Sequence, residues 1–258
     1  MDSINENILK ESKKLQEILN TDLLDKFIEL HHIPKDHSRL GAKQELIAKR
    51  AYFLNVKKKY ALFITNKDGV DIPDGEYEIK GLPIRRSDYP SYTKIKLAQL
   101  LDFLLKSEII SFKSLKEFID KTEEEIRNLS LKGDISVARP VSYKSTDYKR
   151  IPSHVLAMHR WNEWEYKYFT PGSRGYQFNV KGINFDKAPD RIKKQMSKIK
   201  DFDRIVIPIE EIILPDYYLV DVDAMLKFAW ISRINEILEP LLGKVREKQK
   251  MESVVMSW

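Results

Sequence analysis

Four residues, Asn66 to Gly69, constrain the fold of this chain more than any other stretch of its sequence. Their sequence, "NKDG", lies between the run "KYALFIT", which is rich in β-branched and aromatic residues, and the run "GEYEIKGL". Asparagine, aspartate and glycine favour tight turns between strands because they tolerate positive φ angles. We therefore expect an antiparallel hairpin here, and a further β-rich run in "QELIAKRAYFLN" before it.

Helical periodicity occurs near both ends of the chain. Apolar residues at helical spacing through residues 4–30 predict one amphipathic helix, or two that break near Asn20 and Thr21. A long last helix is expected from Asp223 to about Lys250, where apolar residues again recur every three or four positions. The hairpin is thus flanked by helices in the sequence.

Two further helices are expected after the hairpin, at residues 91–107 and 111–130. The first has a broad apolar face, and in the second Ser114 and Glu117 have the spacing of a capping box. Short strands are expected in "DISVARPV" and "DRIVIPI", with a loop-rich, aromatic region from Tyr143 to about Phe185 between them. Helices and antiparallel strands in separate runs make the predicted fold class α+β.

The composition excludes several classes of protein. Of the 258 residues, 42% are hydrophobic, which is enough for one large core or two small ones. The absence of cysteine excludes disulfides, thiolate catalysis and cysteine-ligated zinc. Neither an apolar signal region nor a long apolar run is present, so we expect a soluble, cytoplasmic protein without a membrane partner. The 45 Lys and Arg against 39 acidic residues give a formal charge of +6, which is compatible with a polyanionic partner.

No complete active site can be assembled from the sequence. It contains no glycine-rich phosphate loop of the GxxxxGK[ST] or GxGxxG type, and no GxSxG nucleophile motif. His31, His32 and His37 cluster in a loop without accompanying carboxylates, which argues against a zinc site. Asp221 and Asp223 precede a predicted helix, so capping of its free amides explains them better than metal binding. We therefore expect no metal site in this chain.

Three blocks of the sequence, taken together, resemble family B DNA polymerases. The segment "AKQELIAKRAYFLNVKKKYALFITNKDG" resembles the segment around the K-K-[RK]-Y motif of that family. Next, "YEIKGLPIRRSDYPSYTKIKLAQLLDFLL" is similar to the following block, in which "KG" precedes a basic pair, a proline and a helix. Further on, "DISVARPVSYKSTDYKRIPSHVLAMHRW" is similar to the thumb block, where Pro-x-His-Val-x-Ala opens a helix. The resemblance covers nearly the whole chain and is closest to polymerases of T-even-like bacteriophages.

The resemblance implies a division into palm and thumb. Residues 1–83 would be the C-terminal part of the palm, a helix with antiparallel strands that completes the palm of a partner chain. Residues 84–250 would be a mainly helical thumb with short strands, and residues 251–258 a C-terminal tail. Family B catalysis uses "DxxSLYP", "Kx3NSxYG" and "YGDTDS" blocks and exonuclease carboxylates, and none of these blocks occurs here.

We therefore expect the small subunit of a naturally split polymerase, inactive alone. A larger subunit would carry the exonuclease, the fingers and the catalytic palm. Its aspartates would be the main ligands of the Mg²⁺ ions used for two-metal nucleotidyl transfer in DNA replication. Three alternatives stay open: an expressed fragment of a longer polymerase, a non-enzymatic nucleic-acid-binding protein with a thumb-like fold, and a protein-interaction module.

The resemblance also assigns the lysine run to primer–template DNA. In the family this segment lines the minor groove, which presents hydrogen-bond acceptors at every base pair and so can be contacted without reading sequence. Because side chains alternate along a strand, we expect Lys58 to reach the groove and Lys57 and Lys59 to meet phosphate or acidic palm neighbours. Tyr60 would pack beneath the primer end. The alternative is a solvated charge run at the start of a strand.

Two other parts of the palm block match family positions. Glu45 falls at the palm glutamate, which implies a carboxylate near the catalytic metals that is not a principal ligand. Relatives of the phage type carry an aspartate two residues earlier, where this chain has Lys43, and this leaves the role open. Arg85 and Arg86 would contact phosphate or brace the palm–thumb junction, and a purely structural salt bridge explains them equally well.

The thumb block supplies further DNA-binding candidates, since Lys and Arg contacts to phosphate grip a duplex without reading its sequence. The basic candidates are Arg139, Lys144, Lys149 and Arg150. Tyr143, Tyr148 and His154 accompany them, and Tyr148 and His154 suit loop fixing or packing as well as DNA contact. The aromatic run "RWNEWEYKYF" is interpreted mainly as thumb core.

The end of the chain resembles the clamp-binding tail of phage replicases. Such tails are short and end in apolar and aromatic residues that dock in a pocket of a sliding clamp. Aromatic and aliphatic anchors dominate small interfaces of this kind. The anchors here would be Val254, Val255, Met256 and Trp258, and the alternative is a tail that folds back on its own thumb.

Overall fold

The computed structural model describes residues 2–34, 41–107, 110–145, 147–165, 169–199 and 202–242. The chain divides into two compact units. The first unit comprises Met1–Ala51 and Leu62–Glu78, and the second comprises Tyr52–Ala61 and Ile79–Trp258. No helix among the described residues has the length and apolar character needed to cross a lipid bilayer.

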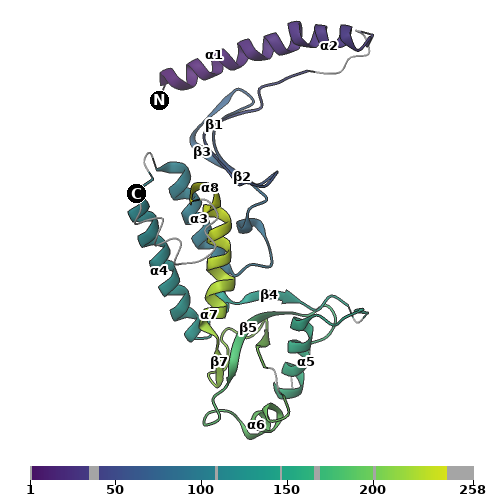
Figure 1. The fold of residues 1–258 in the computed structure, drawn as a ribbon, viewed down its shortest axis with the longest axis vertical. Helices are drawn as coiled ribbons and strands as arrows, with labels where there is room; N and C mark the ends of the chain where they lie inside the picture. Colours follow the sequence, from purple (N-terminus) through teal and green to yellow (C-terminus); the bar gives the residue numbers. More distant parts are fainter. Residues whose placement is uncertain are drawn as a thin grey trace. The chain divides into compact units, whose positions relative to one another are not determined.

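The first unit begins with a helix that changes register once (Figure 1). Helix α1 (Asp2–Ile18) runs into a π-helical turn (Leu19–Leu23) and then α2 (Leu24–Leu30). The π turn lies where the sequence predicts a break, and two side chains there bond to backbone. Thr21 donates to the Glu17 carbonyl (2.9 Å), and the Asn20 amide both donates to and accepts from the backbone of Ala42. Such competing bonds favour a local π bulge.

Three strands form a sheet in the order β1 (Leu46–Phe53), β2 (Tyr60–Lys67), β3 (Val70–Lys80). The central strand β2 is the most buried of the three, as expected for a strand with neighbours on both sides. Asp68 and Gly69 link β2 to β3 with φ angles of 51° and 85°. This is the tight turn that the sequence predicts, and the hairpin is confirmed.

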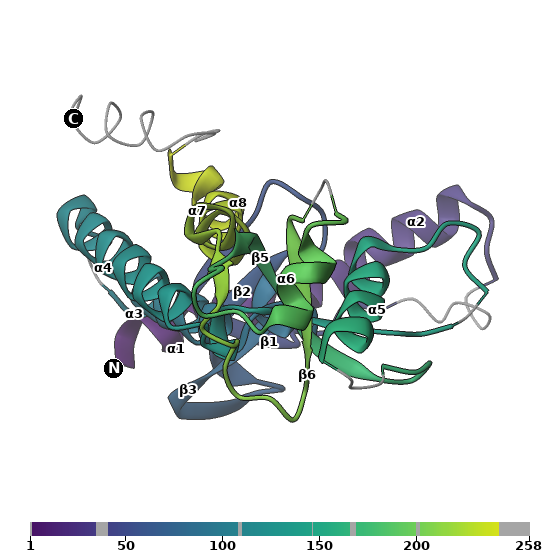
Figure 2. The ribbon, with the colours of Figure 1, turned by 90° about the horizontal axis from the view of Figure 1, so that it is seen from below.

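The second unit contains a helical layer with a mainly aliphatic core. Its helices are α3 (Ser91–Lys106), α4 (Phe112–Leu131), α7 (Val222–Leu226) and α8 (Ser232–Leu242), and a π-helical turn (Lys227–Ile231) joins the last two. Helix α4 lies beside α7 (Figure 1 and Figure 2). The fully buried Trp230 packs near Phe118, and Thr93 donates to the Ala229 carbonyl (2.8 Å).

Two details of this layer differ from the sequence prediction. Helix α4 begins one turn before the predicted capping box, because Ser111 is the N-cap and its hydroxyl accepts from the Ser114 amide (3.4 Å). Ser114 is therefore inside the helix, and the capping box of Ser114 and Glu117 is wrong. At the other end of the layer, Asp221 accepts from the Ala224 amide (3.0 Å), which confirms it as a helix cap.

A second antiparallel sheet carries the rest of the unit. Its order is β4 (Arg139–Ser142), β5 (Arg174–Ile183), β6 (Arg204–Pro208), and β7 (Tyr218–Val220) also pairs with β5. Helix α5 (Ser153–Glu165) packs against β6, and the short α6 (Asp190–Met196) follows β5. Trp161 and Trp164 of α5 and Phe169 after it are buried, so the described part of the aromatic run is core as expected, and residues 166–168 lie outside the described residues.

Strand β5 was not expected, because its region was predicted to be loop-rich. It pairs with three strands and is buried on both faces over much of its length, so it lacks the alternation that marks a half-exposed strand. Gly175 and Gly182 within it also read as loop residues in the sequence. Upstream, a 3₁₀ turn (Ile135–Val137) occupies the first half of the strand predicted in "DISVARPV".

Candidate nucleic-acid interface

The three lysines lie in the turn between β1 and β2. The Leu54 amide donates to the Lys59 carbonyl (3.0 Å), and the Lys59 amide donates to the Val56 carbonyl (3.3 Å), which closes the turn. Lys58 has a φ of 64°, in the left-handed region. The prediction that these lysines alternate along a strand is therefore wrong, since a residue with left-handed backbone cannot continue a strand.

The turn separates the lysines into two kinds. The Lys59 ammonium group lies 2.5 Å from a carboxylate oxygen of Glu236 on α8, and both side chains are about two-thirds buried, with 31% and 28% of their surface exposed. Lys57 and Lys58 are exposed and form no ion pair among the described residues. Lys59 thus meets an acidic neighbour, as expected, but on α8. Lys57 and Lys58 are the cations available to a ligand.

A glycine holds the lysine turn close to the exit of β3. Gly81 has a φ of 66°, and a Cβ atom there would lie 2.7 Å from the Lys58 carbonyl oxygen. Any other residue at this position would push the turn away. Tyr60 begins β2, and its ring lies 5.9 Å from that of Phe53 and 5.5 Å from the Lys80 ammonium group. Contacts with Phe53 and Lys80 therefore surround the Tyr60 ring at the base of the turn.

Arg85 and Arg86 differ in their surroundings. Arg85 ends a 3₁₀ turn (Pro83–Arg85) and is exposed. Arg86 donates two bonds of 3.0 Å to the carboxylate of Asp88, which is the structural salt bridge that the sequence left open. Partial burial acts to raise the pKa of Asp88, but the hydrogen bonds and charge of Arg86, with a smaller effect of Arg139, hold that pKa below its usual value. Asp88 is therefore ionised at neutral pH.

The loop after β4 is fixed by two of the predicted residues. The Tyr148 hydroxyl accepts from the backbone amides of Lys144 (3.0 Å) and Ser145 (3.3 Å). The Nε2 atom of His154 lies 3.2 Å from the Ser142 carbonyl oxygen. Both side chains hold the loop in shape. The basic residues it presents, Lys144, Lys149 and Arg150, are exposed.

Positive groups converge around His154. Its pKa is lowered, chiefly because it is partly buried and further because Arg139, Arg204 and Lys144 are close, although its bond to the Ser142 carbonyl opposes the shift. The structure therefore brings Arg139 and Lys144 of the predicted set together. Arg204 was not predicted, since in the sequence it only marks the start of a strand.

The metal-adjacent role of Glu45 is not tested by the geometry. Glu45 is exposed just before β1, and its carbonyl accepts from the Asp68 amide (2.8 Å). Lys43 pairs with the same Asp68 (2.5 Å). Within the described residues, no three acidic, histidine or cysteine side chains gather as metal ligands would. His37 of the histidine cluster and the four tail residues Val254, Val255, Met256 and Trp258 lie outside the described residues.

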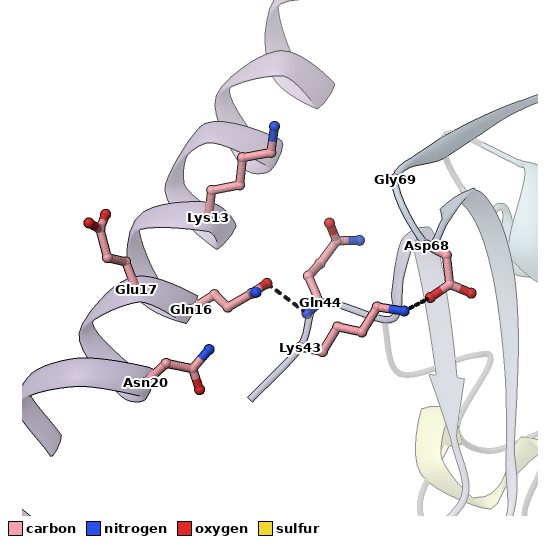
Figure 3. A pocket seen from close by; sticks show the side chains of 8 residues that line it. All are labelled: Lys13, Gln16, Glu17, Asn20, Lys43, Gln44, Asp68 and Gly69. Atoms are coloured by element: carbon pink, nitrogen blue, oxygen red, sulfur yellow. Dashed lines mark hydrogen bonds and ion pairs between the residues drawn. The ribbon is translucent and has the colours of Figure 1, made fainter. Parts of the chain in front are cut away.

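A polar pocket in the first unit has a structural explanation (Figure 3). It is open, has a volume of about 350 Å³, and is lined by Lys13, Gln16, Glu17, Asn20, Lys43, Gln44, Asp68 and Gly69. Its two lysines are balanced by two carboxylates. The Gln16 side chain accepts from the Gln44 amide (3.0 Å), so polar groups here bind the helix to the start of β1.

The helix of the first unit turns its polar side toward its own chain and its apolar side outward. Gln16 and Asn20 bond to the backbone before β1, as described above. Seven large apolar residues on the helix are exposed by 37% to 75%, namely Ile8, Leu15, Ile18, Leu19, Leu23, Phe27 and Leu30. We call this set the apolar stripe. An exposed apolar surface of this kind is typical of a protein–protein contact.

Comparison with known proteins identifies the fold. No protein-family model and no curated protein matches the sequence. The solved structure of the family B DNA polymerase from the hyperthermophilic archaeon Pyrobaculum calidifontis matches with a TM-score of 0.50 and 20% identity. This chain shares its fold with part of that polymerase. The match covers 92% of this chain but only 28% of the polymerase, and the α+β fold class is confirmed.

Proposed function

We propose that the chain is the C-terminal palm and thumb portion of a family B DNA-directed DNA polymerase. It grips primer–template duplex as the smaller subunit of a split nucleotidyltransferase that acts in DNA replication. The observation that carries this proposal is the fold shared with a family B polymerase over 92% of the chain, in a sequence that has three family blocks in order.

The lysine turn supports contact with the minor groove. Lys57 and Lys58 project from a tight turn whose base is held by Gly81, and they lack ion-pair partners among the described residues. A duplex offers groove acceptors at every base pair, so lysine donors held in place can follow it independently of sequence. Basic residues of the thumb, Arg139, Lys144, Lys149 and Arg150, would add phosphate contacts.

The apolar stripe supports the proposal that a second protein binds to the palm portion of this chain. Residues 1–83 would complete a palm whose catalytic aspartates and Mg²⁺ belong to the larger subunit, which also carries the exonuclease and the fingers. The stripe would pack against that subunit, where its burial contributes about 25 cal/mol per Å² of apolar surface. Residues 84–250 are assigned to the thumb, and the tail at residues 251–258 to a sliding clamp.

Duplex binding by the chain itself is the test of this function. The readout is fluorescence anisotropy of a labelled primer–template duplex, and a single strand and a second duplex of unrelated sequence are run as comparisons. The proposal predicts that both duplexes bind equally well, more tightly than the single strand, with an affinity that falls steeply with salt. Affinity that depends on sequence, or no affinity for duplex at low salt, would contradict it.

A further inference from the structure

Three arginines of the second unit meet at two aromatic rings. The guanidinium carbon of Arg233 lies 4.4 Å from the centre of the Tyr89 ring and 5.4 Å from that of Phe228. Arg86 lies 5.0 Å from the same Tyr89 ring, and Arg139 lies 5.4 Å from the same Phe228 ring. Each of the two rings is therefore shared by two of the three guanidinium groups. We call Arg86, Arg139 and Arg233 the arginine cluster.

The cluster is drawn from three distant parts of the sequence. Arg86 follows a 3₁₀ turn, Arg139 begins β4 and Arg233 lies in the first turn of α8. Tyr89 is almost fully buried, with 3% of its surface exposed, so one of the shared rings is fixed in the core. The positions of the guanidinium groups are thus set by the fold, which lowers the cost of ordering them around a ligand.

One carboxylate serves two members of the cluster. Asp88 receives both bonds of Arg86, at 3.0 Å each, and a terminal nitrogen of Arg139 lies 4.0 Å from the second oxygen of Asp88. The Arg86 and Arg139 side chains remain 59% and 42% exposed. Asp88 therefore orients these arginines without covering them.

The second nearby carboxylate is engaged elsewhere. The negative charge of Glu236 contributes to raising the pKa of Arg86, but a carboxylate oxygen of Glu236 is already paired with the Lys59 ammonium group at 2.5 Å. Arg233 has no ion pair among the described residues, and the Nε atoms of Arg233 and Arg139 are buried without an acceptor there. Four cations thus face two carboxylates, which leaves an excess of positive charge.

An anion with several oxygens satisfies this arrangement better than a further carboxylate of the chain could. The planar fork of a guanidinium group binds phosphate through parallel N–H bonds. Stacking on a ring does not occupy the in-plane N–H groups, although in Arg86 two of them already bind Asp88. Arginines that share rings and a carboxylate offer several donors to the multiple oxygens of a phosphate group. The same chemistry fits free inorganic phosphate and a phosphodiester.

We propose that the arginine cluster binds a backbone phosphate of nucleic acid, and that Arg233 is a binding residue beside Arg86 and Arg139. The identity of the ligand rests on the proposed function, whereas the phosphate chemistry rests on the cluster alone. Arg233 lies in the same helix as Glu236, the partner of Lys59. The phosphate site is thereby connected through α8 to the lysine turn.

The test measures duplex affinity as a function of salt for single variants. Arg233→Ala is expected to weaken binding of a labelled primer–template duplex about tenfold, because hydrogen bonds to charged groups are strong. It should also reduce the slope of log affinity against log salt by about 1, the value for one lost phosphate contact. Arg233→Lys keeps the charge and should keep most of the slope, but lose affinity because the fork is gone.

Arg127→Ala is the matched control, since Arg127 belongs to the same unit but pairs with Asp223 outside the cluster. Equal duplex binding by the Arg233→Ala and Arg127→Ala variants would overturn the proposal. Thermal unfolding shows whether each variant folds. If Arg233→Ala does not fold, Arg233→Lys decides, and unchanged affinity of that variant would overturn the proposal.

Two further outcomes separate the sources of phosphate. In the first outcome, inorganic phosphate stabilises the wild-type chain but not the Arg233→Ala variant, and duplex affinity is the same for both. This would show a site for free anions and overturn the nucleic-acid assignment. If the wild-type chain binds no duplex, the proposed function fails together with this inference. If Lys58→Gly weakens duplex binding but Arg233→Ala does not, only this inference fails.

Discussion

The ammonium group of Lys59 lies 2.5 Å from Glu236, so the turn between β1 and β2 is tied to α8 across 177 residues of sequence. The pair is partly buried, with 31% and 28% of the two side chains exposed. It removes one lysine of the run from contact with a ligand and fixes the backbone that presents the other two. The same carboxylate also places negative charge beside the arginine cluster.

Glu236→Gln is expected to lower stability and raise duplex affinity, which are opposite effects of one substitution. Loss of a partly exposed ion pair costs up to about 1 kcal/mol in the free energy of unfolding. Removing a negative charge beside four cations should raise duplex affinity about threefold at low salt and less at high salt. Urea unfolding and anisotropy titration measure the two effects. Glu239→Gln, one turn away on α8, is the control; equal affinity gains for both variants would contradict the account.

Lys58→Gly is expected to weaken duplex binding about tenfold without loss of stability. A lysine with a φ of 64° carries backbone strain that glycine does not. The substitution removes about 1 kcal/mol of this strain, which offsets the greater entropy of glycine in the unfolded chain. Lys58→Ala keeps the strain and should bind equally weakly. Lys132→Ala removes one exposed lysine from the end of α4 and should bind like wild type. Unchanged binding by both Lys58 variants would show that Lys58 does not contact DNA.

Stability is expected to fall as the pH is lowered through about 6.5, the ordinary pKa of histidine, because His154 has a lowered pKa in the folded chain. The unfolded chain then binds more protons than the folded chain, so the free energy of unfolding decreases with decreasing pH. His154→Gln should make this decrease shallower. Urea unfolding of the two proteins between about pH 5 and pH 8 measures it. Parallel curves for the wild type and the variant would exclude His154 as the cause.

The double substitution Leu15→Lys and Leu23→Lys is expected to reduce association of the chain with the larger subunit, against which the apolar stripe is proposed to pack. Both residues belong to the apolar stripe and are more than half exposed, at 57% and 52%, so their replacement should change the unfolding free energy by no more than about 0.5 kcal/mol. Light scattering after size exclusion reports the association state. Lys10→Glu, also on α1, is the control, and an unchanged distribution of species would contradict a docking role for the stripe.

The parts of the fold that depend on local chemistry could be predicted from the sequence. Asp68 and Gly69 favour their turn wherever they occur between strands, and Asp221 caps a helix that starts beside it. The break near Asn20 was also predictable, although the π turn that makes it depends on Ala42, which is far along the chain. Buried strand β5 was missed because a strand covered on both faces has no alternation.

The candidate site was predicted only in part, because its arrangement depends on contacts that are distant in sequence. The lysines were identified from the sequence, but the positive φ of Lys58 could not be predicted, because lysine does not favour this backbone conformation. Arg233 was missed because a single arginine in a helix usually faces solvent. Only the fold brings it to the rings of Tyr89 and Phe228, where it joins Arg86 and Arg139.

Primer extension by two chains, mixed and apart, tests whether this chain is the smaller subunit of a split polymerase. The second chain would be a product of the same genome that carries the "DxxSLYP" and "YGDTDS" blocks and ends soon after them, as the proposed function requires. The mixture is expected to extend a primer in the presence of Mg²⁺, neither chain should do so alone, and Lys58→Gly should slow the mixture. Extension by the larger chain alone at the rate of the mixture, or no extension by a mixture that binds the duplex, would contradict this expectation.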